Sequence, residues 1–254
     1  MPWGLRRAES RRFPGPAARA GDPAHAALLA TYLGDMVRPY GLDAPTGMAG
    51  GQAYGEMAAA LLPAEPVQAL VLAYDIPDLH PGRATATYLS HLCPGSPQAF
   101  AVSDQGRAGA HTALRLLRDY ARSGLYEHSL LIVAEQSSLP YDPAVPVEVP
   151  AAHCAVALHL GPSTVDIPAP RILADADAVQ VLDALGDVSA ATVVLGAHLI
   201  GYEADIKADR IVRADPGQPM TGVWEALAAL DDGPVVLADY DPALRYLCVS
   251  AFGC

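Results

Sequence analysis

Two hydrophobic patterns alternate along this chain of 254 residues. Uninterrupted apolar runs are typical of strands covered on both faces, whereas apolar residues that recur every three or four positions indicate amphipathic helices. The predicted strands are residues 1–13, 67–73, 99–102, 129–134, 151–160, 192–198, 234–238 and 246–251. The predicted helices are residues 23–38, 54–62, 83–92, 107–122, 176–185 and 222–230. This alternation predicts an α/β fold in which helices cover the sheets.

The segment 99–138 shows the alternation most clearly. A short apolar strand is followed by a polar turn and then by a helix that begins near Arg107 and ends at Ser123-Gly124. The turn consists of Ser103, Asp104, Gln105 and Gly106. Ser and Asp favour the start of a helix, so we expect Ser103 and Asp104 to cap it. Such a turn brings backbone N–H groups and the positive end of the helix dipole together, where many enzymes hold a nucleophile.

Overall charge excludes some classes of partner. The chain has 52% hydrophobic residues and a net charge of −12. This negative charge argues against binding to nucleic acid or to an anionic membrane. No stretch of about 20 apolar residues and no secretory signal are present, so we expect a cytoplasmic protein.

The four cysteines predict no metal site and no disulfide framework. Cys93, Cys154, Cys248 and Cys254 form neither a CxxC pair nor a Cys/His cluster at metal-ligand spacing. Cys154 and Cys248 lie in apolar runs and are expected to be buried. Cys93, in a loop rich in proline and glycine, and the terminal Cys254 are expected to be exposed. We predict neither a metal nor a cofactor.

The turn and its surroundings resemble the nucleophile elbow of the thiolase superfamily, in particular the ketoacyl-acyl-carrier-protein synthase III branch. The residues that carry this resemblance are Ala99-Phe100, Gly109, Ala113-Leu114, Ser123-Gly124 and Ala134-Glu135. The resemblance spans most of the chain and is strongest over residues 67–138 and 217–252. It implies a thiolase-like fold of two pseudo-repeated halves in five layers, with residues 1–160 as the first half and residues 161–254 as a shortened second half.

The family's chemistry requires a cysteine, a histidine and an asparagine. In this chain the cysteine position falls on Gly106 or Arg107, depending on a one-residue gap, and neither can form an acyl thioester. An arginine at that place also opposes the helix dipole. The resemblance places the histidine at His198, at the end of a predicted strand, and the asparagine position at Gly217, beside Gln218.

Other catalytic patterns are weaker. The chain contains no GxSxG elbow, no GxGxxG motif and no P-loop. A decarboxylase variant of the family replaces the cysteine by glutamine, and Gln105 lies one or two positions from that place. Asp75 and Asp78 are paired carboxylates in a proline-containing turn, where we expect them to be solvated.

The missing cysteine predicts a non-catalytic subunit. The chain is similar in this respect to the non-catalytic subunit of the bacterial alkylquinolone synthase. The resemblance implies a heterodimer or heterotetramer with a Cys-bearing ketosynthase III-like subunit, in fatty-acid, polyketide or other secondary-metabolite biosynthesis. Acyl-CoA or acyl-acyl-carrier-protein would be the substrate of the complex, and an acyl carrier protein a further partner. Residues 99–103 are expected to form the centre of the subunit interface.

Two alternatives stay open. A stand-alone acyltransferase of this fold would use His198 as a general base and transfer the acyl group without a covalent intermediate. A homodimeric protein that binds an acyl group or another small molecule would need no catalysis. Turnover by the isolated chain distinguishes the first alternative from the accessory subunit.

Overall fold

Two five-stranded sheets form the framework of the molecule. The computed structural model describes residues 1–17, 22–42, 51–80, 83–139, 141–143, 145–231 and 233–253. The first sheet contains β1 (Trp3–Phe13), β2 (Ala69–Ala73), β3 (Gln98–Val102), β4 (Ser129–Glu135) and β5 (His153–Pro162). The second contains β6 (Arg171–Leu173), β7 (Thr192–Leu195), β8 (Arg210–Arg213), β9 (Val235–Asp241) and β10 (Tyr246–Phe252).

The two sheets have the same topology. Their strand orders are β1-β5-β4-β2-β3 and β6-β10-β9-β7-β8, so each strand of the first sheet corresponds to the strand five places later. In both sheets the two pairings on one side of the central strand are parallel, and the two pairings on its other side are antiparallel. The predicted pseudo-repeat is confirmed.

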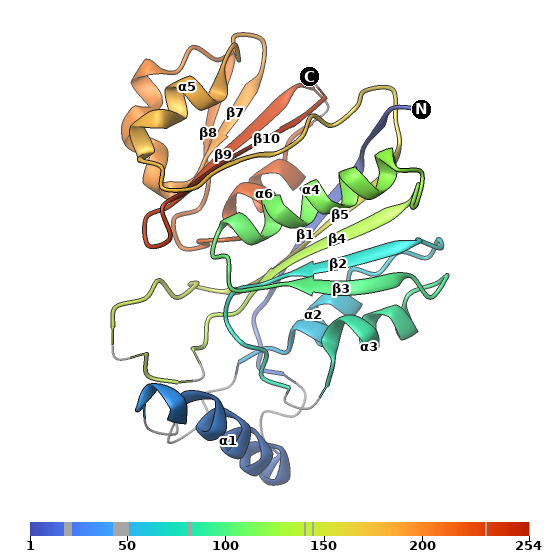
Figure 1. Cartoon of the computed structure of the whole chain (residues 1–254), viewed down its shortest axis with the longest axis vertical. Coiled ribbons are helices and arrows are strands. Elements are labelled where there is room, and N and C mark those ends of the chain that lie inside the picture. Colours follow the sequence, from blue (N-terminus) through green and yellow to red (C-terminus); the bar gives the residue numbers. More distant parts are fainter. Residues whose placement is uncertain are drawn as a thin grey trace.

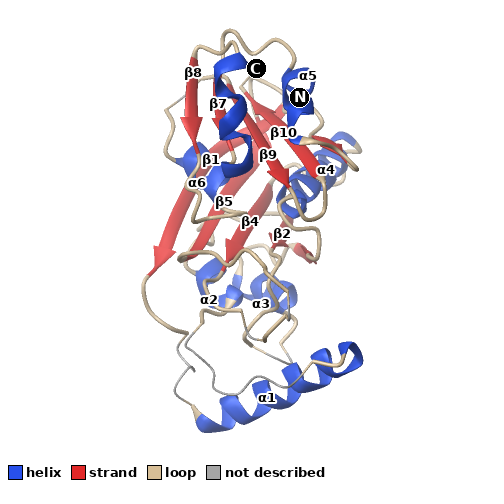
Figure 2. Cartoon of the chain, turned by 90° about the vertical axis from the view of Figure 1, so that its left-hand side faces the viewer, coloured by secondary structure: helices blue, strands red, loops and turns tan. Residues whose placement is uncertain are grey.

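Helices separate and cover the sheets. They are α1 (Pro23–Val37), α2 (Tyr54–Ala59), α3 (Thr85–Leu92), α4 (Ala108–Arg122), α5 (Val181–Leu185) and α6 (Gly222–Ala228), with 3₁₀ segments η1 (Arg38–Tyr40), η2 (Ala178–Gln180) and η3 (Ala197–Asp205). From bottom to top, Figure 1 shows α2 and α3, the first sheet, α4 and α6, the second sheet, and α5. These are the five layers that the resemblance implies. Helix α1 lies apart from them in both views (Figures 1 and 2).

The core follows from the helical pattern of α4. In its predicted apolar stripe, Ala110, Ala113, Leu114 and Leu117 are fully buried between the sheets, and Ala121 at the end of the helix is partly buried. The central strand β4 is buried along its whole length, as its uninterrupted apolar sequence predicts. This packing fixes the first turn of α4 against strand ends of both halves.

The second half is built from shorter elements. Helices α5 and α6 have 5 and 7 residues, whereas α4 has 15. Strands β6 and β8, with 3 and 4 residues, have no apolar run and were not expected. The proposed boundary after residue 160 stays a prediction, and β5 continues to Pro162.

Several boundaries differ from the predicted ones. Strand β7 ends at Leu195, so His198 lies in η3 and not at a strand end. Cys93 is buried with the α2–β2 side of the first sheet, contrary to the expected exposure. Cys154 and Cys248 are buried as predicted, and Cys254 lies outside the described residues. Within the described ranges, no helix has the length and apolar character needed to cross a bilayer.

Candidate functional site

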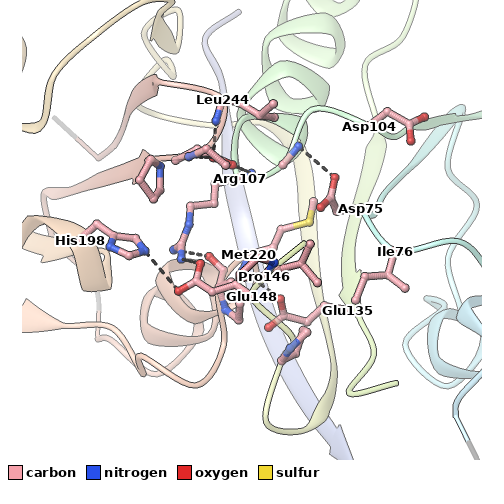
Figure 3. Close-up of a pocket in the computed structure, with 17 residues that line it drawn as sticks. Asp75, Ile76, Asp104, Arg107, Glu135, Pro146, Glu148, His198, Met220 and Leu244 are labelled. Atoms are coloured by element: carbon pink, nitrogen blue, oxygen red, sulfur yellow. Dashed lines mark hydrogen bonds and ion pairs between the residues drawn. The ribbon is translucent and has the colours of Figure 1, made fainter. Parts of the chain in front are cut away.

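A cavity of about 630 Å³ opens where the carboxyl ends of the central strands of both halves converge. Its lining includes Gly106, Arg107, Glu135, Glu148, His198 and Asp241 (Figure 3). The structure therefore brings Gly106, Arg107 and His198 into one space. Gly217, Gln218 and Gln105 are not part of its lining.

At one position of the turn before α4, the backbone conformation and the surrounding space allow only glycine. Gly106 has φ +51°, and a Cβ there would lie 2.0 Å from a carboxylate oxygen of Asp241. The Gly106 N–H donates to Asp75 at 3.0 Å, and the Arg107 N–H donates to Asp241 at 3.0 Å. Backbone donors that could receive an oxyanion are thus occupied by carboxylates of the same chain.

The predicted local cap is wrong. The Ser103 hydroxyl donates to the Asp104 carboxylate at 2.7 Å and makes no cap bond to α4. Asp75 and Asp241 take this role because the ends of β2 and β9 lie next to the turn. The expectation of solvated acids is also wrong for Asp78, which accepts hydrogen bonds from the Tyr54 N–H and the Thr85 hydroxyl.

Arg107 is buried and fully engaged by polar partners. Its side chain is 5% exposed. One terminal nitrogen donates to the Pro219 carbonyl at 2.6 Å and lies 3.3 Å from Asp239, while the other donates to Glu148 at 2.6 Å. Burial disfavours the charge, but Asp239 and Glu148 outweigh it and keep the pKa of Arg107 above its usual value.

Asp239 is the buried counterion of Arg107. Burial raises the pKa of Asp239 to about 6, although the guanidinium and the backbone N–H of Tyr240 act in the opposite direction. Arg107 therefore neutralises a carboxylate that would otherwise be costly in this position.

His198 joins the same network through Glu148. The imidazole Nε2 lies 3.2 Å from one Glu148 oxygen, and Arg107 binds the other oxygen (Figure 3). Partial burial opposes the ionisation of Glu148, yet the hydrogen bond and charge of Arg107 lower its pKa overall. The contacts form a continuous chain across the cavity, from α4 to η3.

Glu135 caps the second central helix. Its carboxylate accepts hydrogen bonds from the Met220 N–H at 2.9 Å, from the Gln218 amide at 2.6 Å and from the Thr221 hydroxyl. Burial is the main cause that raises the pKa of Glu135 to about 7. Gln218, considered as a donor beside the asparagine position, is thus used inside the protein, and the Gly217 N–H donates to Asp215.

Sequence reasoning did not assign the carboxylates that line this site to their roles in capping and ion pairing. Glu135 and Asp241 are the last residues of buried strands, and Asp75 follows one two residues later. An acid directly after an apolar run was the signal that could have identified them. Glu148 lies in a proline-rich loop and carries no such signal.

No described cysteine reaches the cavity. Cys93, Cys154 and Cys248 are buried elsewhere and do not line it. Burial also raises the pKa of the Cys154 thiol to about 12 and that of Cys248 further, which opposes thiolate formation. Among the residues described by the structure, no three histidine, cysteine, aspartate or glutamate side chains are grouped to hold a metal ion.

Comparison with solved structures reveals the same fold in condensing enzymes. The chain is similar to 3-oxoacyl-(acyl carrier protein) synthase III from Pseudomonas aeruginosa PAO1, with a TM-score of 0.65 and 16% identity over 100% of this chain and 98% of that chain. For OleA from Xanthomonas campestris the TM-score is 0.61, with 13% identity over 99% and 97% of the two chains. For AbyA1, a tetronic acid condensing enzyme, it is 0.62, with 15% identity over 98% and 99%.

These similarities establish the fold. No protein-family model matches the chain, and no curated protein sequence matches it. The chain has the thiolase-like α/β fold of ketoacyl synthase III, as predicted from the elbow segment.

Proposed function

We propose that this chain is a catalytically degenerate ketosynthase III-like subunit that pairs with an active, Cys-bearing ketosynthase or acyltransferase. The partner would carry the acyl group, delivered as acyl-CoA or acyl-acyl-carrier-protein, in fatty-acid, polyketide or other secondary-metabolite biosynthesis. This chain would bury an apolar face of the partner and shape its acyl pocket.

One observation carries the proposal: the turn that could hold a nucleophile is closed by an internal ionic network. Arg107 fills the space with a buried guanidinium held by Asp239 and Glu148. The backbone N–H groups of Gly106 and Arg107 are bonded to carboxylates. The chain thus keeps the fold, but its elbow turn presents neither a thiol nor these two N–H groups to a substrate.

The cavity's charge supports the same conclusion. Five carboxylates line it, from Asp75, Asp104, Glu135, Glu148 and Asp241, against the single arginine, Arg107, and the imidazole of His198. This excess of negative charge disfavours entry of an acyl group carried on an anionic phosphate-bearing thioester. The chemistry is therefore assigned to the partner.

Reconstitution tests the proposal. The chain, a Cys-bearing ketosynthase III-like protein from the same organism, and the two together are assayed with acyl-thioester substrates. We expect no turnover by this chain alone and at least tenfold more product from the pair than from the synthase alone. Equal product with and without this chain would contradict the proposal.

The Glu148–His198 contact favours a second candidate function. A histidine oriented by a carboxylate is the arrangement of a general base, and both side chains line the cavity. A stand-alone acyltransferase would then turn over acyl thioesters by itself and lose this activity in His198→Ala. Absence of turnover by the isolated wild-type chain would reject this candidate.

A further inference from the structure

A second cavity, of about 420 Å³, lies between α1 and the first turn of α3. Its volume is within the range of about 300–1,000 Å³ that is usual for sites of small ligands. Tyr32 and Met36 of α1 and Tyr74, just after β2, supply a largely apolar wall, and Arg83 supplies a cation. None of these four residues lines the first cavity, so they have no part in the network of Arg107.

Two donors of Arg83 lack an acceptor. Its Nε and one terminal nitrogen are buried and make no hydrogen bond within the part of the chain that the structure describes. The guanidinium lies 4.2 Å above the ring of Tyr88, and a Cβ at Gly55 of α2 would come within 2.5 Å of a terminal nitrogen. Buried donors are almost always hydrogen-bonded in folded proteins, so this position of the guanidinium is costly. Because Arg83 also lines the cavity, rotation of its flexible side chain would present the donors to a carboxylate there.

The same cavity carries negative charge, from Asp75, Asp78 and Asp104. Asp78 already accepts two hydrogen bonds. Asp75 and Asp104 line the first cavity as well, on its side away from His198 (Figure 3), so they lie where the two cavities meet. Burial raises the pKa of Asp75, and the charges of neighbouring carboxylates raise it further. A cation beside Asp75 and Asp104 would relieve this repulsion.

We propose that the second cavity binds a small zwitterion, an amino acid with a large apolar side chain. The carboxylate of the ligand pairs with Arg83, and its ammonium group lies against Asp75 and Asp104. Its side chain packs on Tyr32 and Met36. A ligand of one sign fits less well, because an anion alone meets the aspartates and a cation alone leaves Arg83 without an acceptor. The inference concerns this chain alone and does not rest on the proposed function.

Isothermal titration calorimetry of the isolated chain with L-phenylalanine tests the proposal. Two matched ligands each lack one charge: 3-phenylpropanoate has no ammonium group, and L-phenylalaninamide has no carboxylate. We expect L-phenylalanine to bind at least tenfold more tightly than either, because only the amino acid satisfies both ends of the site.

Three variants locate the two ends. Arg83→Leu is expected to weaken the binding of L-phenylalanine at least tenfold, through loss of the donors. Asp104→Asn should weaken it about fivefold, and the fold should be kept because Asn tolerates the left-handed backbone of this position, φ +60°. Arg122→Leu is the matched control, since it removes an arginine whose side chain is 61% exposed on α4 and should leave the affinity unchanged. Circular dichroism confirms that each variant is folded.

Each contrary outcome overturns the assignment. Absence of L-phenylalanine binding at millimolar concentration, or equal affinity in Arg83→Leu and wild type, would show that Arg83 holds no such ligand. If 3-phenylpropanoate binds as tightly as L-phenylalanine and Asp104→Asn has no effect, the ligand is a simple anion and not a zwitterion. If L-phenylalaninamide binds as tightly, the site recognises a cation and the role of Arg83 is refuted.

Discussion

The two halves begin their central helices in related but unequal ways. In each half, a carboxylate that ends the middle strand reaches across to the central helix of the other half. Asp241, at the end of β9, accepts from the Arg107 N–H of α4. Glu135, at the end of β4, accepts from the Met220 N–H just before α6. The halves therefore cap each other reciprocally.

The difference lies in what surrounds each cap. Glu135 is enclosed by neutral polar partners, Gln218 and Thr221. The start of α4 instead carries the charged network of Arg107, Asp239 and Glu148 beside the cavity. Residues at both helix starts line the cavity, and the buried ion pairs are found at the start of α4. Both helix ends serve stability, but the start of α4 has been closed with charge.

Removing the charge of Arg107 should have the largest effect. In Arg107→Met, Asp239 stays buried, at 1% exposure, without its cation. We expect a loss of about 3–5 kcal/mol in the free energy of unfolding at pH 8, measured by urea denaturation. The pKa of Asp239 should rise further above its unfolded value of about 4, so the loss is full at pH 8 and shrinks towards pH 4.5.

A second substitution isolates the cause. In Arg107→Met/Asp239→Asn the unpaired charge is gone, and part of the lost stability should return at pH 8. A loss below about 1 kcal/mol at both pH values for the single variant would show that the network contributes little to stability.

The next largest effect should be the removal of the reciprocal caps. Glu135→Ala removes the acceptor of the Thr221 hydroxyl and the Met220 N–H in the interior, at a cost of about 3 kcal/mol. The Gln218 amide also loses its shortest bond and keeps those to the Ala152 carbonyl and the Thr221 hydroxyl. Asp241→Ala should cost about 2 kcal/mol, because water from the cavity can reach part of the exposed donors. Urea unfolding at pH 7 measures both, and an equal or reversed order would contradict the comparison.

The pH dependence of stability should distinguish the two caps. Glu135 has a folded pKa of about 7, above its unfolded value of about 4.5. Its contribution is therefore fully present below pH 4.5 and is lost as the pH rises through 7. Between pH 5 and 7 the wild-type chain should lose about 2 kcal/mol relative to Glu135→Gln, whose side chain does not titrate. Parallel pH profiles would contradict this assignment.

The smallest effect is expected at His198. Its bond is to the half-exposed Glu148, so His198→Ala should change the free energy of unfolding by less than about 0.5 kcal/mol. The reconstituted complex should keep its activity within about twofold. A larger fall in turnover, with the free energy of unfolding unchanged, would show that His198 takes part in catalysis.

Much of the fold could be predicted from periodicity. Eight strands lie at predicted positions. Asp22 caps α1 by accepting a hydrogen bond from the Ala24 N–H. Strands β6 and β8 were missed because 3 or 4 residues with charged ends have no detectable pattern. Their place is decided by pairing with β10 and β7, which is a tertiary effect.

The candidate site was predictable only in part. The elbow, with Gly106 and Arg107, is local in sequence and was located correctly as a strand–turn–helix. Its partners are not local, since Asp241 lies 134 positions from Arg107. No local rule connects such residues, and for this reason Ser103 and Asp104 were wrongly expected to cap the helix.

The most direct test of the central claim is the native mass of this chain purified with and without a Cys-bearing ketosynthase III-like synthase from the same organism. The closed elbow and the proposed pairing predict a mixed complex, with the acyl group found by mass only on the synthase after incubation with an acyl thioester. A stable homodimer that does not bind the synthase, or an acyl adduct on this chain, would contradict the account.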